Sequence, residues 1–159
     1  MNAKRILVAV IICATAVTIA AAQRGYGAME TAKKKDLTGT WLLTITPDEP
    51  GAVPFDGLYT FTSDGIALFS SVGPPIPGLG NPGHGIWERT GPTTFAVIWK
   101  QFTYDDIFTC NGSLVVRSNI NVSGADTFTS QDTVNILDLQ GNTLVTVGGS
   151  QQARRMTIE

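Results

Sequence analysis

The sequence predicts an all-β protein: a single antiparallel up-and-down β-barrel of about eight strands, preceded by an N-terminal signal helix. Three observations support this fold class. Stretches that alternate apolar and polar residues recur from residue 37 onward, and a period of two is typical of half-buried strands. Turn-forming residues separate these stretches at short intervals, which favours sequential hairpins. No segment shows a helical period, and only 15% of the residues are charged.

Residues 1–22 are predicted to be a cleaved signal peptide. The basic pair Lys4 and Arg5 precedes an apolar run that ends in three alanines, which suits cleavage before Gln23. One alternative is an uncleaved anchor, because an apolar run of this length lies at the short limit for crossing a bilayer. Another is lipidation at Cys13, which the large residue before it disfavours. We expect a secreted or periplasmic protein with no stable membrane insertion after cleavage.

Residues 23–36 lack a period and are predicted to form a tether, and residues 37–159 to form the barrel domain. Cys110 is the one cysteine of the mature chain, so no intramolecular disulfide can form. A domain of this length can rest on its own hydrophobic core. The formal net charge of -2 gives no basic excess, so a nucleic-acid partner is not expected. The pattern does not indicate an oligomeric state.

The first barrel strand is predicted at residues 37–46, where Trp41, Leu43 and Ile45 share one face. The next three strands are predicted at 57–62, 66–71 and 85–90, with a tight turn at Asp64-Gly65. Between the strands at 66–71 and 85–90, residues 72–83 contain four prolines and four glycines, and this composition excludes a central strand there. This segment is interpreted either as a rim or lid at the mouth of the barrel, or as a plain connection.

The second half of the barrel begins with the longest strand signal, at residues 93–104. Further strands are predicted at 114–122, 126–137 and 143–147, and a terminal stretch at 154–158 places Arg154, Met156 and Ile158 on one face. Sequential strands of this number can close into an up-and-down barrel, which removes exposed sheet edges. A barrel of eight strands has room for packed side chains or for one small ligand.

The tripeptide Gly39-Thr40-Trp41, the strand meander and Arg154 near the end of the chain together resemble the lipocalins and the wider calycin group. The resemblance implies that Trp41 packs against Arg154 and that, with Gly39, they close one end of the barrel. Such a contact between a guanidinium and an indole is worth about 0.5–2 kcal/mol. The stretches 85–88, 61–65 and 153–156 also resemble small secreted bacterial proteins of unassigned function and, more distantly, the barrels of allene oxide cyclase and dirigent proteins.

Aromatic residues in strand phase are the candidates for binding a ligand. They would line an apolar pocket if side chains do not fill the lumen. The candidates are Tyr59, Phe61, Trp87, Phe95 and Trp99. The expected function is therefore the binding of a small apolar ligand, without a cofactor. A barrel with a filled lumen and a structural or surface-interaction role is the alternative.

An enzymatic role is the third hypothesis, and its candidate residues are Glu88, His84 and Tyr104. A cyclase-like or isomerase-like barrel would need these side chains to converge in one cavity, where they could act as acids or bases. The favoured interpretation is that Glu88 is an outward charge paired with Lys100 or Arg89 and that His84 is a turn residue beside the Gly-Pro-rich segment. No nucleophile-elbow, phosphate-loop or dinucleotide motif is present, and one histidine with one mature cysteine cannot form a zinc set. The sequence thus favours a protein that is not an enzyme, and it predicts no metal site.

Overall fold

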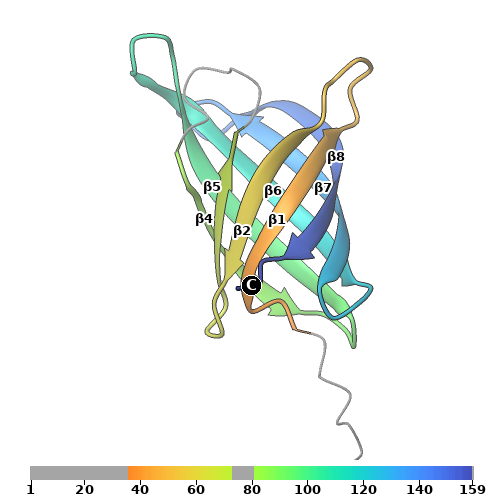
Figure 1. The fold of residues 1–159 in the computed structure, drawn as a ribbon. Helices are drawn as coiled ribbons and strands as arrows, with labels where there is room; N and C mark the ends of the chain where they lie inside the picture. Colours follow the sequence, from red (N-terminus) through yellow and green to blue (C-terminus); the bar gives the residue numbers. More distant parts are fainter. Residues whose placement is uncertain (1–35, 73–80, 159) are drawn as a thin grey trace, which may run out of the picture. The chain divides into compact units, whose positions relative to one another are not determined.

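A computed structural model describes residues 36–72 and 81–158, which form a closed barrel of eight antiparallel strands (Figure 1). The strands are β1 (Gly39–Pro47), β2 (Phe55–Phe61), β3 (Ile66–Ser71), β4 (Gly83–Arg89), β5 (Thr94–Tyr104), β6 (Cys110–Val122), β7 (Thr127–Leu137) and β8 (Thr143–Arg155). Each pairs with its neighbours in sequence, and β8 closes the barrel on β1. The predicted fold class is confirmed. The predicted signal peptide lies outside the described residues.

None of the described residues forms a helix that is long and apolar enough to cross a membrane.

The largest difference from the predicted strands is at β8. The sequence pattern suggested two short stretches, 143–147 and 154–158, whereas the structure has one strand that ends at Arg155. Glycines and glutamines between the two stretches hide the strand because their own preference for strands is weak. Pairing with β7 on one side and β1 on the other holds this segment extended.

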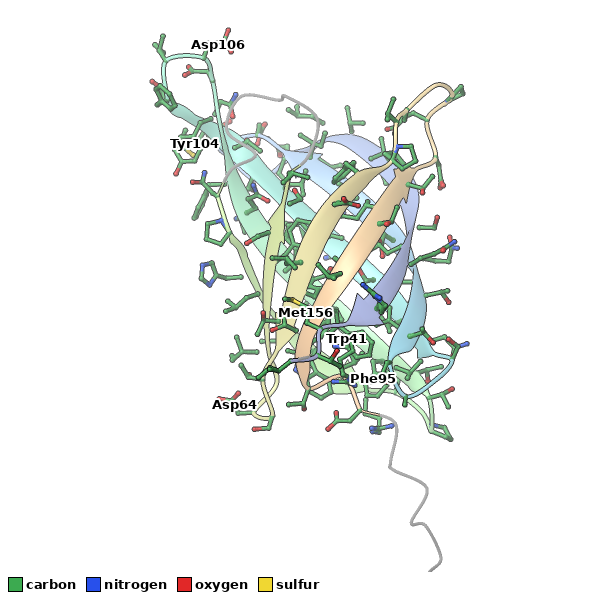
Figure 2. All side chains as sticks on the ribbon, viewed as in Figure 1. Trp41, Asp64, Phe95, Tyr104, Asp106 and Met156 are labelled. Atoms are coloured by element: carbon green, nitrogen blue, oxygen red, sulfur yellow. The ribbon has the colours of Figure 1, made fainter. Side chains whose placement is uncertain are left out.

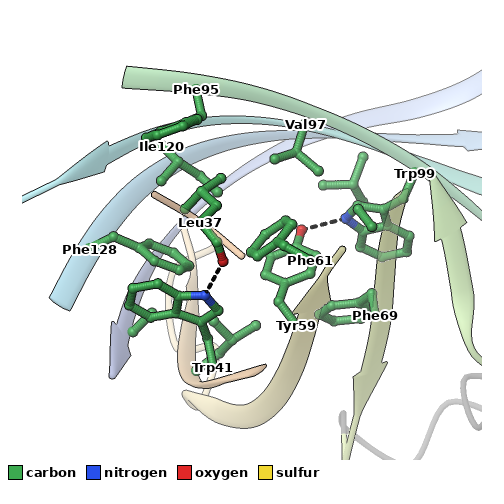
Figure 3. Close-up of a cluster of buried hydrophobic side chains, with 14 of the residues drawn as sticks. Leu37, Trp41, Tyr59, Phe61, Phe69, Phe95, Val97, Trp99, Ile120 and Phe128 are labelled. Atoms are coloured by element: carbon green, nitrogen blue, oxygen red, sulfur yellow. Dashed lines mark hydrogen bonds between the residues drawn. The ribbon is translucent and has the colours of Figure 1, made fainter. Parts of the chain in front are cut away.

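One end of the barrel is filled by aromatic and aliphatic side chains, and we call it the closed end (Figure 3). It lies where β1 begins and β8 ends. Trp41 packs on Phe128 with ring centroids 4.8 Å apart, and Phe61 lies 6.5 Å from Phe128. The most deeply buried large side chains are Trp41, Tyr59, Phe61, Phe95, Phe128, Leu37, Ile120 and Val122. Burial of this extent makes the closed end the hydrophobic core of the domain.

Trp41 is held at this end by contacts on two sides. Its indole Nε1 donates a hydrogen bond of 2.7 Å to the carbonyl of Leu37. The guanidinium of Arg155 lies over the indole ring, 4.1 Å from its centroid. Arg155 also donates to the carbonyl of Asp36 at 2.7 Å and forms an ion pair of 3.3 Å with Asp126. These contacts join the start of β1, the end of β8 and the turn before β7.

The closing arginine is therefore Arg155, and the prediction of Arg154 is wrong by one residue. Arg154 is exposed and pairs with Leu42, which is on the outer face. Gly39 contributes room for the correct arginine. Its φ of 122° suits glycine, and a Cβ at this position would lie 2.9 Å from the Arg155 Nη1 atom.

Replacing Arg155 by alanine should lower the free energy of unfolding by about 2 kcal/mol, because a cation–π contact and hydrogen bonds from a charged donor are lost together. The matched substitution Arg154→Ala should change it by less than about 0.5 kcal/mol, as is usual for an exposed side chain. Urea unfolding of the two variants measures the difference. Equal losses in both would contradict the assignment of Arg155.

Candidate functional site

The opposite end of the barrel, which we call the mouth end, differs in the exposure of its inward-facing side chains. The turns at 48–54, 105–109 and 138–142 lie there. Val145 follows the inward phase of β8 and is 47% exposed, and its partners on the same face, Ile136 and Leu114, are partly exposed. At the closed end, by contrast, inward Trp41 is 0% exposed and inward Phe128 is 1% exposed. Some inward-phase side chains are thus more exposed at the mouth end than at the closed end. Most of the predicted rim at 72–83 lies outside the described residues.

Gly149 lies on the inward face of β8, opposite Asp132 of β7. A Cβ at this position would meet only the backbone of β1, the nearest atom being the Thr46 carbonyl oxygen at 3.3 Å, and no side chain closer than 4.0 Å. The situation at Gly83 is the reverse, because a Cβ there would lie 2.4 Å from the ring of Trp99. Trp99 therefore occupies the space that Gly83 leaves, whereas a Cβ on Gly149 would be in close contact with the backbone of β1.

A layer of buried polar side chains separates the two halves of the lumen, and we call it the polar layer. It consists of Tyr59, Trp99, Ser118, Ser130, Asp132 and Gln151. The Trp99 Nε1 donates to the Tyr59 hydroxyl at 2.6 Å, and that hydroxyl lies 3.5 Å from the Ser118 Oγ. The Ser130 hydroxyl donates to Asp132 at 2.8 Å, and the Gln151 Nε2 donates to the second oxygen of the same carboxyl. All six side chains are at least nine-tenths buried.

Burial raises the pKa values of two groups in the polar layer. It raises the pKa of the Asp132 carboxyl, because loss of water penalises the charged form, and hydrogen bonds from Ser118, Ser130 and Gln151 act in the opposite direction. The nearby Asp48 raises the pKa of Asp132 further by charge repulsion. Burial likewise raises the pKa of the Tyr59 hydroxyl well above its usual value, so Tyr59 is neutral. Asp132 forms no ion pair with a described lysine or arginine.

Among residues 36–72 and 81–158, two glutamine amides carry buried atoms that have no hydrogen-bond partner. They are the Oε1 of Gln151 and the Nε2 of Gln101, in side chains that are 3% and 2% exposed. Gln101 follows Trp99 on the inward face of β5, one step nearer the mouth end. An unpaired buried polar atom costs about 1–3 kcal/mol, and native proteins keep few of them. The polar layer and its surroundings thus present one unused acceptor and one unused donor.

The five predicted ligand-binding residues divide between the two halves of the barrel. Tyr59 and Trp99 belong to the polar layer. Phe61, Phe95 and Trp87 belong to the packed closed end, where Trp87 lies 5.7 Å from the Phe95 ring and 6.1 Å from the Phe61 ring. Of the five, the structure therefore brings only Tyr59 and Trp99 to the border between the closed end and the mouth end.

The three candidate acid–base residues do not meet. His84 and Glu88 are exposed on the outer face of β4, and Tyr104 is half-buried at the mouth end of β5 (Figure 2). The predicted convergence of these side chains in one cavity is wrong, because their strand phase points the first two away from the lumen. Within residues 36–72 and 81–158, no three histidine, cysteine or acidic side chains are grouped closely enough to hold a metal ion.

Sequence reasoning missed Asp132, Gln151 and Gln101. One signal was available for Asp132, since it lies in phase with Phe128 and Val134 and so on the inward face of the predicted strand at 126–137. For Gln151 the signal was hidden, because no strand was predicted between residues 147 and 154.

No protein-family model and no curated protein matches the chain. Among solved structures, the chain is similar to one described as EF1p2_mFAP2b bound to DFHBI, with a TM-score of 0.53 and 16% identity over 76% of this chain and 94% of that chain. A redesigned β-barrel, b11L5F_LGL, gives a TM-score of 0.46 and 17% identity over 76% of this chain and 92% of that chain. The first likeness supports the fold alone: a closed, eight-stranded antiparallel barrel.

Proposed function

We propose that this protein is a lipocalin-like binding barrel that holds one small, mainly apolar ligand in the mouth half of its lumen, and that it acts outside the cytoplasm, as its leader predicts. The observation that carries the proposal is the contrast between the two halves of the barrel. Aromatic rings fill the closed end, whereas apolar side chains on the inward face of the mouth end remain partly exposed. Partly open apolar concavities with a few polar groups are the usual form of a small-molecule site.

The lining of the mouth half suits a ligand with an apolar body and a polar group at its buried end. Ile45, Phe55, Leu114 and Val134 contribute apolar wall, and the polar layer forms the floor. The unpaired atoms of Gln101 and Gln151 are available to a ligand that reaches this floor. The structural neighbour EF1p2_mFAP2b is described as bound to DFHBI, which is compatible with ligand binding by a barrel of this fold.

Titration with the neutral fluorophore N-phenyl-1-naphthylamine tests the proposal. The protein purified after expression of the full chain should give a saturable rise in fluorescence with one site per barrel. Gly149→Phe should weaken binding at least tenfold, because its ring would project inward from β8 at the position opposite Asp132. Gln152→Phe adds the same ring to the exposed outer face of β8 and should leave the affinity unchanged.

Equal affinities in the two variants would show that the fluorophore does not contact the inward face of β8 at Gly149, and would contradict a lumen site. Absence of saturable binding in the parent protein would favour the alternative, a filled barrel with a structural role.

A further inference from the structure

The carboxyl group of Asp132 is buried without a cation. The residue is 8% exposed, and its oxygens accept hydrogen bonds from the neutral side chains of Ser130 and Gln151. Neutral donors satisfy the lone pairs of a carboxylate but do not offset its charge. A buried carboxylate is therefore costly unless an opposite charge is brought to it. Within the described part of the chain, no lysine or arginine supplies that charge.

Gln151 places a second acceptor beside this carboxyl. When Nε2 donates to Asp132, Oε1 is the atom that remains buried and unpartnered. An ionised Asp132 requires this orientation of the amide, because a carboxylate only accepts hydrogen bonds. A carboxylate oxygen and an amide oxygen on neighbouring side chains form a receptor for a positively charged hydrogen-bond donor.

The described turns at the rim of the mouth end are acidic. The turns at 48–54, 105–109 and 138–142 carry Asp48, Glu49, Asp105, Asp106 and Asp138 and no lysine or arginine. Figure 2 shows Asp106 at this end, opposite Asp64 at the other. Clefts lined by one sign of charge raise the local concentration of ions of the opposite sign. The rim and the floor of the mouth half thus favour the same kind of ligand.

We infer that the ligand is an organic amine, whose apolar body occupies the mouth half and whose ammonium group is received by Asp132 and the Oε1 of Gln151. This inference rests on the proposed function and specifies its ligand class. The ammonium group supplies a positive charge that offsets the charge of Asp132. It also donates a hydrogen bond to the Oε1 of Gln151, which otherwise has no donor. An anionic ligand would meet the buried carboxyl and the acidic rim, and a neutral ligand would leave the charge of Asp132 uncompensated.

Displacement of N-phenyl-1-naphthylamine by three compounds of similar size tests the inference at neutral pH. The compounds are 2-phenylethylamine, 2-phenylethanol and phenylacetate, which differ mainly in charge. The amine should displace the fluorophore at a concentration at least tenfold lower than the alcohol, and phenylacetate should be the weakest. In Asp132→Asn, the amine should lose at least tenfold in affinity, while the affinities for the alcohol and the fluorophore should change less than about threefold.

Equal binding of amine and alcohol by the parent protein overturns the inference and leaves the proposed function standing. A preference for the amine that is unchanged in Asp132→Asn also overturns the inference and leaves the proposed function standing. If neither the fluorophore nor any of the three compounds binds, both the inference and the proposed function fall.

Asparagine keeps the size of Asp132, and the Gln151 amide can turn to pair with it, so this variant should fold and melt at or above the temperature of the parent. A second variant changes an exposed side chain, so its folding does not depend on packing in the core. Asp48→Asn, on the exposed rim, should weaken the amine about two- to threefold without affecting the alcohol, and Asp64→Asn at the closed end should do neither. An unchanged amine affinity in Asp48→Asn would contradict the role of the acidic rim.

Discussion

Trp41→Ala should destabilise the barrel by about 3–5 kcal/mol, the range observed when a large buried aromatic side chain is truncated. Trp41 is 0% exposed, packs on Phe128 and donates to the carbonyl of Leu37. Its loss would leave a cavity at the closed end, an unpaired carbonyl and an Arg155 guanidinium without the ring beneath it. These effects act on β1, β7 and β8 together, where the barrel closes.

Urea unfolding measures this loss, and Leu42→Ala is its matched control. Leu42 is the next residue on β1, but its side chain is on the outer face and is 41% exposed. The control should lose no more than about 1 kcal/mol, since little apolar area is uncovered. A melting temperature only one or two degrees below that of the parent would contradict a closing role for Trp41.

The contact between Trp41 and Arg155 was only partly predictable from the sequence. The strand that carries Trp41 was predictable because its apolar side chains alternate without interruption. The identity of the arginine was not, since Arg154 and Arg155 are consecutive and the choice depends on the phase of β8. Met156 and Ile158 suggested the wrong phase. Both lie beyond the end of β8 and are exposed, so their spacing carries no information about the strand face.

The polar layer was harder to predict for a different physical reason. Asp132 and Gln151 lie on adjacent strands, and their pairing depends on the register between β7 and β8. That register shifts between Ile136 and Leu137, and no sequence pattern within either strand predicts the shift. Polar residues on an inward face also contradict the binary pattern from which strands are predicted. Departures of this kind are expected at functional sites, where local preference and burial conflict.

Gly85→Ala should destabilise the protein by about 3 kcal/mol or more, at the upper end of what overpacking costs. A Cβ on Gly85 would lie 2.0 Å from the carbonyl oxygen of Ile98 and 2.5 Å from the Cα of Trp99. Both are backbone atoms of β5, so no side-chain rotation relieves the contact. Gly85 is paired with Trp99 on one side and Ala67 on the other, and β4 cannot move away from β5 without straining its pairing with β3.

The control is Ile86→Thr, which changes the neighbouring residue to another β-branched side chain at a position that is 60% exposed. It should alter the free energy of unfolding by less than about 1 kcal/mol, and a similarly small change in Gly85→Ala would show that β4 and β5 tolerate a wider spacing. Because Trp99 donates to Tyr59 within the polar layer, displacement of β5 should also weaken binding of N-phenyl-1-naphthylamine in Gly85→Ala. If Gly85→Ala is less stable but binds the fluorophore as tightly as the parent, the spacing of β4 and β5 does not affect the floor of the proposed site.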